Sequence, residues 1–115
     1  MIIYTDKFIP KKSVAITLGF IILIRPQYKD DIGLLKHEQI HVKQFWKSFC
    51  LFPLLYLLSS KYRLDSEVEA YREQLRYSEN DMGPIYAKYL SENYHLSISP
   101  NEALRRLMIN NKQGV

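Results

Sequence analysis

A chain of 115 residues with a formal net charge of +4 is long enough for one hydrophobic core and too short for two. We therefore expect a single domain over residues 1–115. Apolar residues make up 47% of the chain and charged residues 24%, which excludes an intrinsically disordered protein. The basic residues are scattered among acidic ones, so we expect no nucleic-acid partner.

Cysteine usage and hydropathy predict the compartment. Cys50 is the only cysteine, which excludes a disulfide within the chain, and its place in an apolar run predicts a buried thiol. The N-terminus lacks the basic start and apolar middle of a signal peptide. The two uncharged stretches, residues 13–24 and 48–60, are shorter than the roughly 18 residues that span a bilayer. We therefore expect a cytoplasmic protein without a transmembrane segment.

The first 26 residues predict β-structure. They are rich in Ile, Val, Thr, Phe and Tyr and are interrupted at Pro10, Gly19 and Pro26. A short strand is expected at residues 2–5 and longer strand material at residues 14–24. Gly19 indicates either a bulge or a turn, and the sequence leaves both open.

Beyond Pro26 the hydrophobic pattern becomes helical. From Ile32 to Trp46 apolar residues recur at intervals of three and four behind a polar start at residues 29–31, which predicts a first helix. Residues 49–58 predict a second, buried helix, in which Pro53 is tolerated only near the start or at a kink.

Three further helices are predicted in the C-terminal half. Residues 64–77 have apolar positions at helical spacing, with Asp65 or Ser66 near the N-terminus of the helix. Residues 84–93 and 99–110 complete the chain, and the last helix is opened by a capping sequence, Ser99-Pro100-Asn101-Glu102. The fold class is therefore α+β: a small N-terminal sheet or hairpin packed against the first helix, followed by further helices.

The first helix carries an HExxH sequence, His37-Glu38-Gln39-Ile40-His41. Two histidines four residues apart lie on one face of a helix, one turn apart, where both imidazoles can reach one zinc ion. Glu38 is rotated by about 100° around the axis, in the position of a general base acting on a water beside the metal. The alternative is a coincidental pair of surface histidines, which the amphipathic pattern of the helix disfavours.

A catalytic zinc site needs a third protein ligand. The metzincin extension is absent, because Gln44 and Lys47 stand where that family has glycine and histidine. A carboxylate on the helix at residues 64–77 is the better source. The arrangement resembles the gluzincin clan, in which HExxH is followed by a glutamate on a later helix, in several families within a Glu-x-x-Ala-Asp pattern. The stretch Glu67-Val68-Glu69-Ala70-Tyr71 follows that pattern except at its last position.

Glu67 and Glu69 cannot both face the metal, because residues two apart on a helix point about 200° apart. Glu67 flanks the apolar stripe through Leu64 and Tyr71, which favours it as the ligand over Glu69. Asp65 is a weaker candidate and a better N-cap.

Tyr71 replaces the aspartate that, in the resembling families, would orient a ligating histidine. Either the phenol of Tyr71 takes that role or another residue does. His95 is a surface or capping residue in this interpretation. A role in stabilising an oxyanion is a lesser possibility that His95 shares with Tyr94, Tyr71 and Arg72.

The resemblance, strongest to the minimal gluzincin-like proteins called minigluzincins, spans roughly residues 14–77 and implies a zinc-dependent peptidase. Zn²⁺ would be held by His37, His41 and Glu67, and Glu38 would act as catalytic base on a peptide or protein substrate. In zincins the substrate runs along an edge strand, which residues 14–24 could provide.

Two other functions compete with this interpretation. The small size favours a zinc-binding scaffold or interaction protein of the same fold whose activity is latent or lost. The apolar residues 49–58 also allow contact with a membrane surface.

Overall fold

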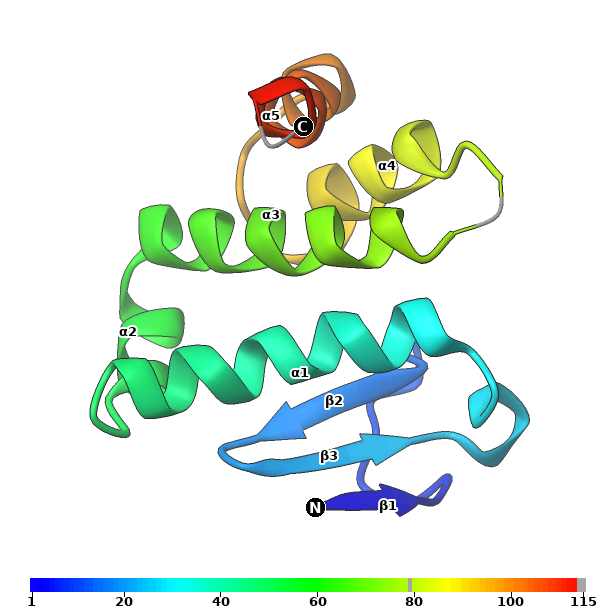
Figure 1. The fold of residues 1–115 in the computed structure, drawn as a ribbon. Helices are drawn as coiled ribbons and strands as arrows, with labels where there is room; N and C mark the ends of the chain where they lie inside the picture. Colours follow the sequence, from blue (N-terminus) through cyan, green and yellow to red (C-terminus); the bar gives the residue numbers. More distant parts are fainter. Residues whose placement is uncertain (79, 114–115) are drawn as a thin grey trace.

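The computed structural model describes residues 1–78 and 80–113 and confirms an α+β fold with a small sheet and helices. The strands are β1 (Ile2–Tyr4), β2 (Ala15–Leu18) and β3 (Ile21–Ile24). After a 3-10 turn at Pro26–Tyr28 come α1 (Ile32–Lys47), α2 (Phe52–Leu58), α3 (Ser60–Arg76), α4 (Gly83–Asn93) and α5 (Pro100–Gln113). The sheet lies against one side of α1 and α3 against the other, with α4 and α5 beyond α3 (Figure 1). None of the described helices is both long and apolar enough to cross a membrane.

The sheet places β2 at an edge beside α1. Strand β3 is central, pairing parallel with β1 and antiparallel with β2 in the order β1-β3-β2. Gly19 forms the turn between β2 and β3 with a φ of 65°, a conformation that favours glycine, so the turn is the correct alternative. A Cβ on Gly19 would lie 3.3 Å from the ring of Phe45 on α1, so the hairpin also approaches this helix closely.

Side-chain caps set where the long helices begin. The Asp31 carboxylate accepts a hydrogen bond from the Leu34 amide at 3.0 Å and opens α1. The Ser59 hydroxyl accepts from the Tyr62 amide at 3.1 Å and opens α3. The prediction that Asp65 or Ser66 lies near the start of that helix is therefore wrong, because Ser59 starts it earlier. The predicted cap of the last helix is confirmed, since the Ser99 hydroxyl accepts from the Glu102 amide at 3.1 Å.

The second helix is shorter and more exposed than the sequence suggests. Pro53 lies in its first turn, as predicted, but Phe52 is its only buried residue. The leucines of α2 are exposed, because a two-turn helix at the end of the molecule contacts neighbours along one face only. Cys50 is exposed as well, so the predictions of a buried helix and a buried thiol are both wrong.

Two apolar clusters flank the central helices. One joins the sheet to α1 through Ile22, Ile24 and Leu34. The other joins α3, α4 and α5, and its buried members are Val68, Tyr71, Tyr86, Ala87, Leu90, Ala103 and Leu107. Between these clusters lies the contact of α1 with α3, which contains the predicted metal ligands.

Candidate metal centre

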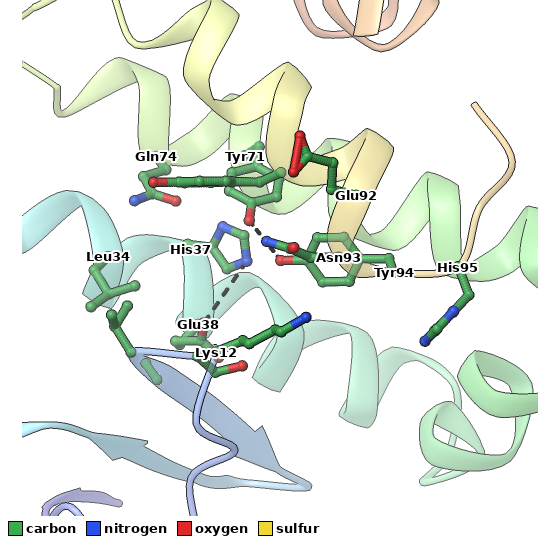
Figure 2. A pocket seen from close by; sticks show the side chains of 14 residues that line it. Lys12, Leu34, His37, Glu38, Tyr71, Gln74, Glu92, Asn93, Tyr94 and His95 are labelled. Atoms are coloured by element: carbon green, nitrogen blue, oxygen red, sulfur yellow. Dashed lines mark hydrogen bonds and ion pairs between the residues drawn. The ribbon is translucent and has the colours of Figure 1, made fainter. Parts of the chain in front are cut away.

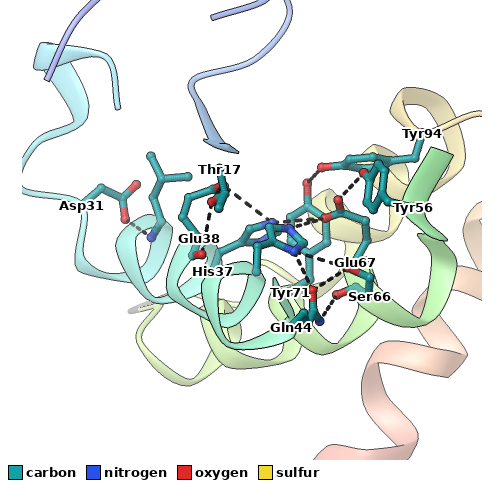
Figure 3. Close-up of polar contacts among 12 residues, drawn as sticks. Thr17, Asp31, His37, Glu38, Gln44, Tyr56, Ser66, Glu67, Tyr71 and Tyr94 are labelled. Atoms are coloured by element: carbon teal, nitrogen blue, oxygen red, sulfur yellow. Dashed lines mark hydrogen bonds and ion pairs between the residues drawn. The ribbon is translucent and has the colours of Figure 1, made fainter. Parts of the chain in front are cut away.

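Helices α1 and α3 run antiparallel and direct three ligand atoms toward one point (Figures 1 and 3). On α1, His37 and His41 lie one turn apart. On α3, the Glu67 carboxylate faces them, with Oε1 at 3.2 Å from Nε2 of His37 and 3.3 Å from Nε2 of His41. All three side chains are buried, and their ligand atoms lie within 4.8 Å of one another.

The donor set and its spacing fit a divalent metal ion. With metal–ligand bonds of about 2.0–2.1 Å, the edges of a tetrahedral site are about 3.3 Å long, close to both Glu67–imidazole distances. Oε1 of Glu67 is buried and makes no hydrogen bond with the described residues, and a cation bound to this oxygen would compensate it. Two imidazoles and one carboxylate are ligands that suit zinc.

The outer nitrogen of His41 is held by an amide whose orientation is fixed. The amide nitrogen of Gln44 donates to the carbonyl oxygen of Ser66 at 3.1 Å and to Oε1 of Glu69 at 2.6 Å, and both of these atoms can only accept. The amide oxygen therefore faces Nδ1 of His41, at 2.9 Å. Nδ1 therefore carries a proton, so Nε2 is the nitrogen that faces Glu67 and that can bind a metal once its own proton is displaced.

The second oxygen of Glu67 is held from α2. The Tyr56 hydroxyl donates to Oε2 of Glu67 at 2.5 Å. Burial and the Glu67 charge raise the pKa of Tyr56, so the phenol stays protonated and donates this bond. The bond leaves Oε1 as the oxygen that faces the two imidazoles.

The outer nitrogen of His37 has no such support. Its Nδ1 is buried without a hydrogen-bond partner among the described residues. The ring of Tyr71 packs edge-on against the imidazole at 4.3 Å between centroids, and its hydroxyl hydrogen-bonds that of Tyr94 at 2.6 Å instead. The sequence left open whether Tyr71 or a different residue orients a ligating histidine. In the structure Gln44 orients His41, and Tyr71 does not form such a bond to His37.

Glu38 lies beside the three-ligand cluster without belonging to it. Its Oε2 is 3.8 Å from Nε2 of His37, farther than Glu67. Its Oε1 accepts a hydrogen bond from the Thr17 hydroxyl of β2 at 2.7 Å. The edge strand thus holds one carboxylate oxygen and leaves the other facing the cluster (Figure 3).

Charge within the cluster perturbs two of its groups. Burial lowers the pKa of His41, but the neighbouring Glu67 carboxylate outweighs burial, and the pKa is raised to about 9. Burial raises the pKa of Glu67, but the two imidazoles outweigh it and hold the pKa well below its usual range. A metal that binds must therefore displace a proton from His41, so its affinity should fall as the pH is lowered below about 9.

Two clefts open on the cluster. One, of about 440 Å³, lies between β2 and α2 and reaches the three cluster residues and Glu38. The other, of about 330 Å³, lies between α1 and the end of α4 and reaches His37 and Glu38 (Figure 2). Asn93 and Tyr94 line both clefts. The cluster is therefore buried, but two clefts connect it to the surface of the protein.

The remaining sequence candidates lie outside the cluster. Glu69 contacts Gln44, and the Asp65 carboxylate pairs with Lys61 at 3.0 Å on the exposed side of α3. His95 is exposed beyond α4, and Arg72 donates to the Arg106 carbonyl oxygen at 2.6 Å on α5.

Sequence reasoning missed the residues that hold the cluster in place. These are Thr17, Gln44, Tyr56 and Ser66. Only Gln44 had a usable signal, because it lies one turn beyond His41 on the same face of a helix. The other three come from different elements.

Glu67→Ala is expected to weaken zinc binding by at least about tenfold, because it removes the only carboxylate in the cluster. Glu69→Ala should weaken it much less, since Glu69 acts only through the Gln44 amide. Competition titration with a zinc chelator measures both affinities. The reverse ranking would transfer the ligand role to Glu69, and two equal small effects would place the third ligand elsewhere.

Comparison with known proteins does not assign the chain to a family. No family model, curated protein or solved structure matches it to a significant degree. The functional argument therefore depends on the cluster of His37, His41 and Glu67 and on what surrounds it.

Proposed function

We propose that the chain is a zinc-dependent metallopeptidase of the gluzincin type. The observation that carries the proposal is the convergence of three buried ligand atoms within 4.8 Å of one another, from His37, His41 and Glu67. A carboxylate that is not one of the three, Glu38, lies next to them. Structural zinc sites bind the metal through four protein ligands, whereas three ligands and an adjacent base are the composition of a hydrolytic site.

Zinc, when bound, supplies a Lewis acid that makes a water more acidic and a carbonyl more electrophilic. In this proposal Glu38 accepts a proton from that water through Oε2 and passes it to the leaving amine. Thr17 donates to Oε1 of Glu38 and so keeps Oε2 turned toward the cluster. Gln44 and Tyr56 hold the ligands in place before the reaction begins.

A peptide substrate is supported by the edge strand. β2 pairs only with β3 among the described residues, so its outer edge is open to an extended peptide. Residues 15–18 of this strand line the cleft of about 440 Å³ that reaches the cluster. A peptide added to β2 would therefore pass over Glu38 and the proposed zinc.

Among the oxyanion candidates Tyr94 has the best position. It lines both clefts, whereas Tyr71 and His95 each line one and Arg72 contacts α5. Burial and the Glu67 charge raise the pKa of Tyr94, so its phenol remains a hydrogen-bond donor at neutral pH.

A zinc-binding scaffold without activity is the second candidate. It is favoured by Nδ1 of His37, which has no hydrogen-bond partner among the described residues, because losing such a partner typically lowers the activity or the metal affinity of a site. In that case the protein would hold zinc and bind a peptide along β2 without cleaving it. The cytoplasmic location stays a prediction from the sequence.

The distinguishing experiment is a cleavage assay with a mixed peptide library in ¹⁸O-labelled water. Zinc-loaded protein is expected to produce peptides with one labelled oxygen in each new C-terminus, and chelation should stop their formation until zinc is restored. If the protein carries one zinc per chain and no labelled product forms, the scaffold function replaces the peptidase.

A further inference from the structure

The end of the molecule formed by α2 and the last turn of α1 exposes a large apolar surface. We define the α2 surface as Trp46, Phe49, Leu51, Leu54, Leu57 and Leu58, all of them exposed. Phe49, Leu57 and Leu58 are exposed by 88%, 74% and 77%. Phe20 of the β2–β3 turn stacks on Trp46 at 6.0 Å, and Figure 1 places this turn at the same end of the molecule. Large apolar side chains that are exposed together at one end of a molecule indicate an interaction site.

The loop that presents this surface is held in a costly conformation. Phe49 and Cys50 both have positive φ angles, of 54° and 69°, between α1 and α2. Residues with a Cβ avoid this region, and Phe49 gains no burial to compensate for it. The loop therefore holds the phenyl ring away from the core of the protein.

The charge near the α2 surface is mainly positive, and the nearest acidic residues, Asp65 and Glu69, line a cleft together with Lys47. No acidic residue occurs between Glu38 and Asp65, whereas Lys43, Lys47, Lys61 and Arg63 do. Lys43 and Lys47 are exposed on α1 and form no ion pair with the residues that the structure describes. The apolar surface is therefore bordered by free positive charge.

We propose that the α2 surface docks on an anionic lipid bilayer. The apolar side chains would enter the boundary between headgroups and acyl chains, where tryptophan is favoured, and the lysines would meet lipid phosphates and carboxylates. A second copy of this chain fits less well. A twofold contact through this surface would bring the exposed lysines of two copies, Lys43 and Lys47, toward each other.

Docking would bring the candidate metal centre to the lipid. Leu57 lines the cleft of about 440 Å³, the Phe52 ring packs against His41 at 5.7 Å, and Tyr56 bonds Glu67. Helix α2 thus forms one wall of this cleft and also carries the surface that would dock on the lipid. If the proposed peptidase function holds, the substrates would be polypeptide segments at a membrane surface. The docking itself requires no metal and does not rest on that function.

The test is vesicle flotation of the full chain. Binding is expected with vesicles of phosphatidylcholine and about one third phosphatidylserine, and Trp46, the only tryptophan, should show blue-shifted emission when it enters the lipid. Phe49→Ser combined with Leu58→Ser should lower the partition coefficient at least about tenfold. The matched control is Phe8→Ser, since Phe8 is 83% exposed with a φ of 67° outside this surface and its loss should leave binding unchanged.

A charge series tests the anionic lipid. Lys43→Gln with Lys47→Gln should lower binding to the anionic vesicles at least about tenfold. Lys29→Gln with Lys88→Gln changes the net charge equally at exposed sites elsewhere and should have little effect. The proposal is overturned by absence of flotation at lipid excess, by equal effects of the surface and control variants, or by a dimer that buries Trp46 in solution. None of these results depends on zinc or peptidase activity, so the two proposals fail separately.

Discussion

Replacing either His37 or His41 by alanine is expected to reduce bound zinc from about one equivalent per chain to background. Each change removes one of three ligand atoms from a buried site whose third member is a single carboxylate oxygen. The loss in affinity should exceed the roughly 100-fold that changes outside the ligand sphere can cost. Elemental analysis after dialysis against a weak chelator measures the stoichiometry.

The matched control for this experiment is the third histidine of the chain. His95 is exposed beyond the end of α4, so His95→Ala should keep the full equivalent of zinc. Stoichiometric zinc in either of the first two variants would contradict the site, and so would loss of zinc in the control.

Glu38→Gln is expected to keep the metal and to lower any peptide hydrolysis by at least about 100-fold. Glutamine has the shape of glutamate and its amide oxygen can still accept the bond from Thr17, but it cannot take a proton from water. Because Glu38 lies 3.8 Å from His37 Nε2 and outside the three-ligand cluster, zinc content should remain near one equivalent.

Glu73→Gln supplies the comparison for this variant. Glu73 is a half-buried carboxylate of α3 that pairs with Arg76 and does not belong to the cluster, so its replacement should leave the rate unchanged. Equal rates in wild-type protein and Glu38→Gln would show that another group is the base, and the zinc content would tell whether the site itself survived.

Features that depend on neighbours along the chain could be predicted from the sequence. The HExxH spacing brings His37 and His41 together wherever the helix forms, and Ser99 caps the last helix through its own local bonds. Glu67 could be predicted as a member of the cluster because this required only the choice of the correct face on one later helix. The single domain, the zinc, the substrate and the absence of a nucleic-acid partner stay predictions.

Features that depend on how elements meet could not be predicted. Gln44 and Glu69 contact each other only because of the rotation of α3 about its axis beside α1. Tyr56 reaches Glu67 from a helix whose composition suggested core. The apolar composition of α2 predicts burial, but composition does not show how many neighbours a helix has. Helix α2 has neighbours on one side only, and its leucines are therefore exposed.

All the buried polar side chains in the described part of the chain belong to α1 and α3: His37, Glu38, His41, Gln44, Ser66, Glu67 and Gln74. The two apolar clusters lie on either side of this layer. A ligand that binds only the folded chain stabilises it by about 2.7 kcal/mol at a free concentration 100 times its dissociation constant. If zinc binds between α1 and α3, the supply of zinc in the cell would therefore set how much folded protein survives turnover.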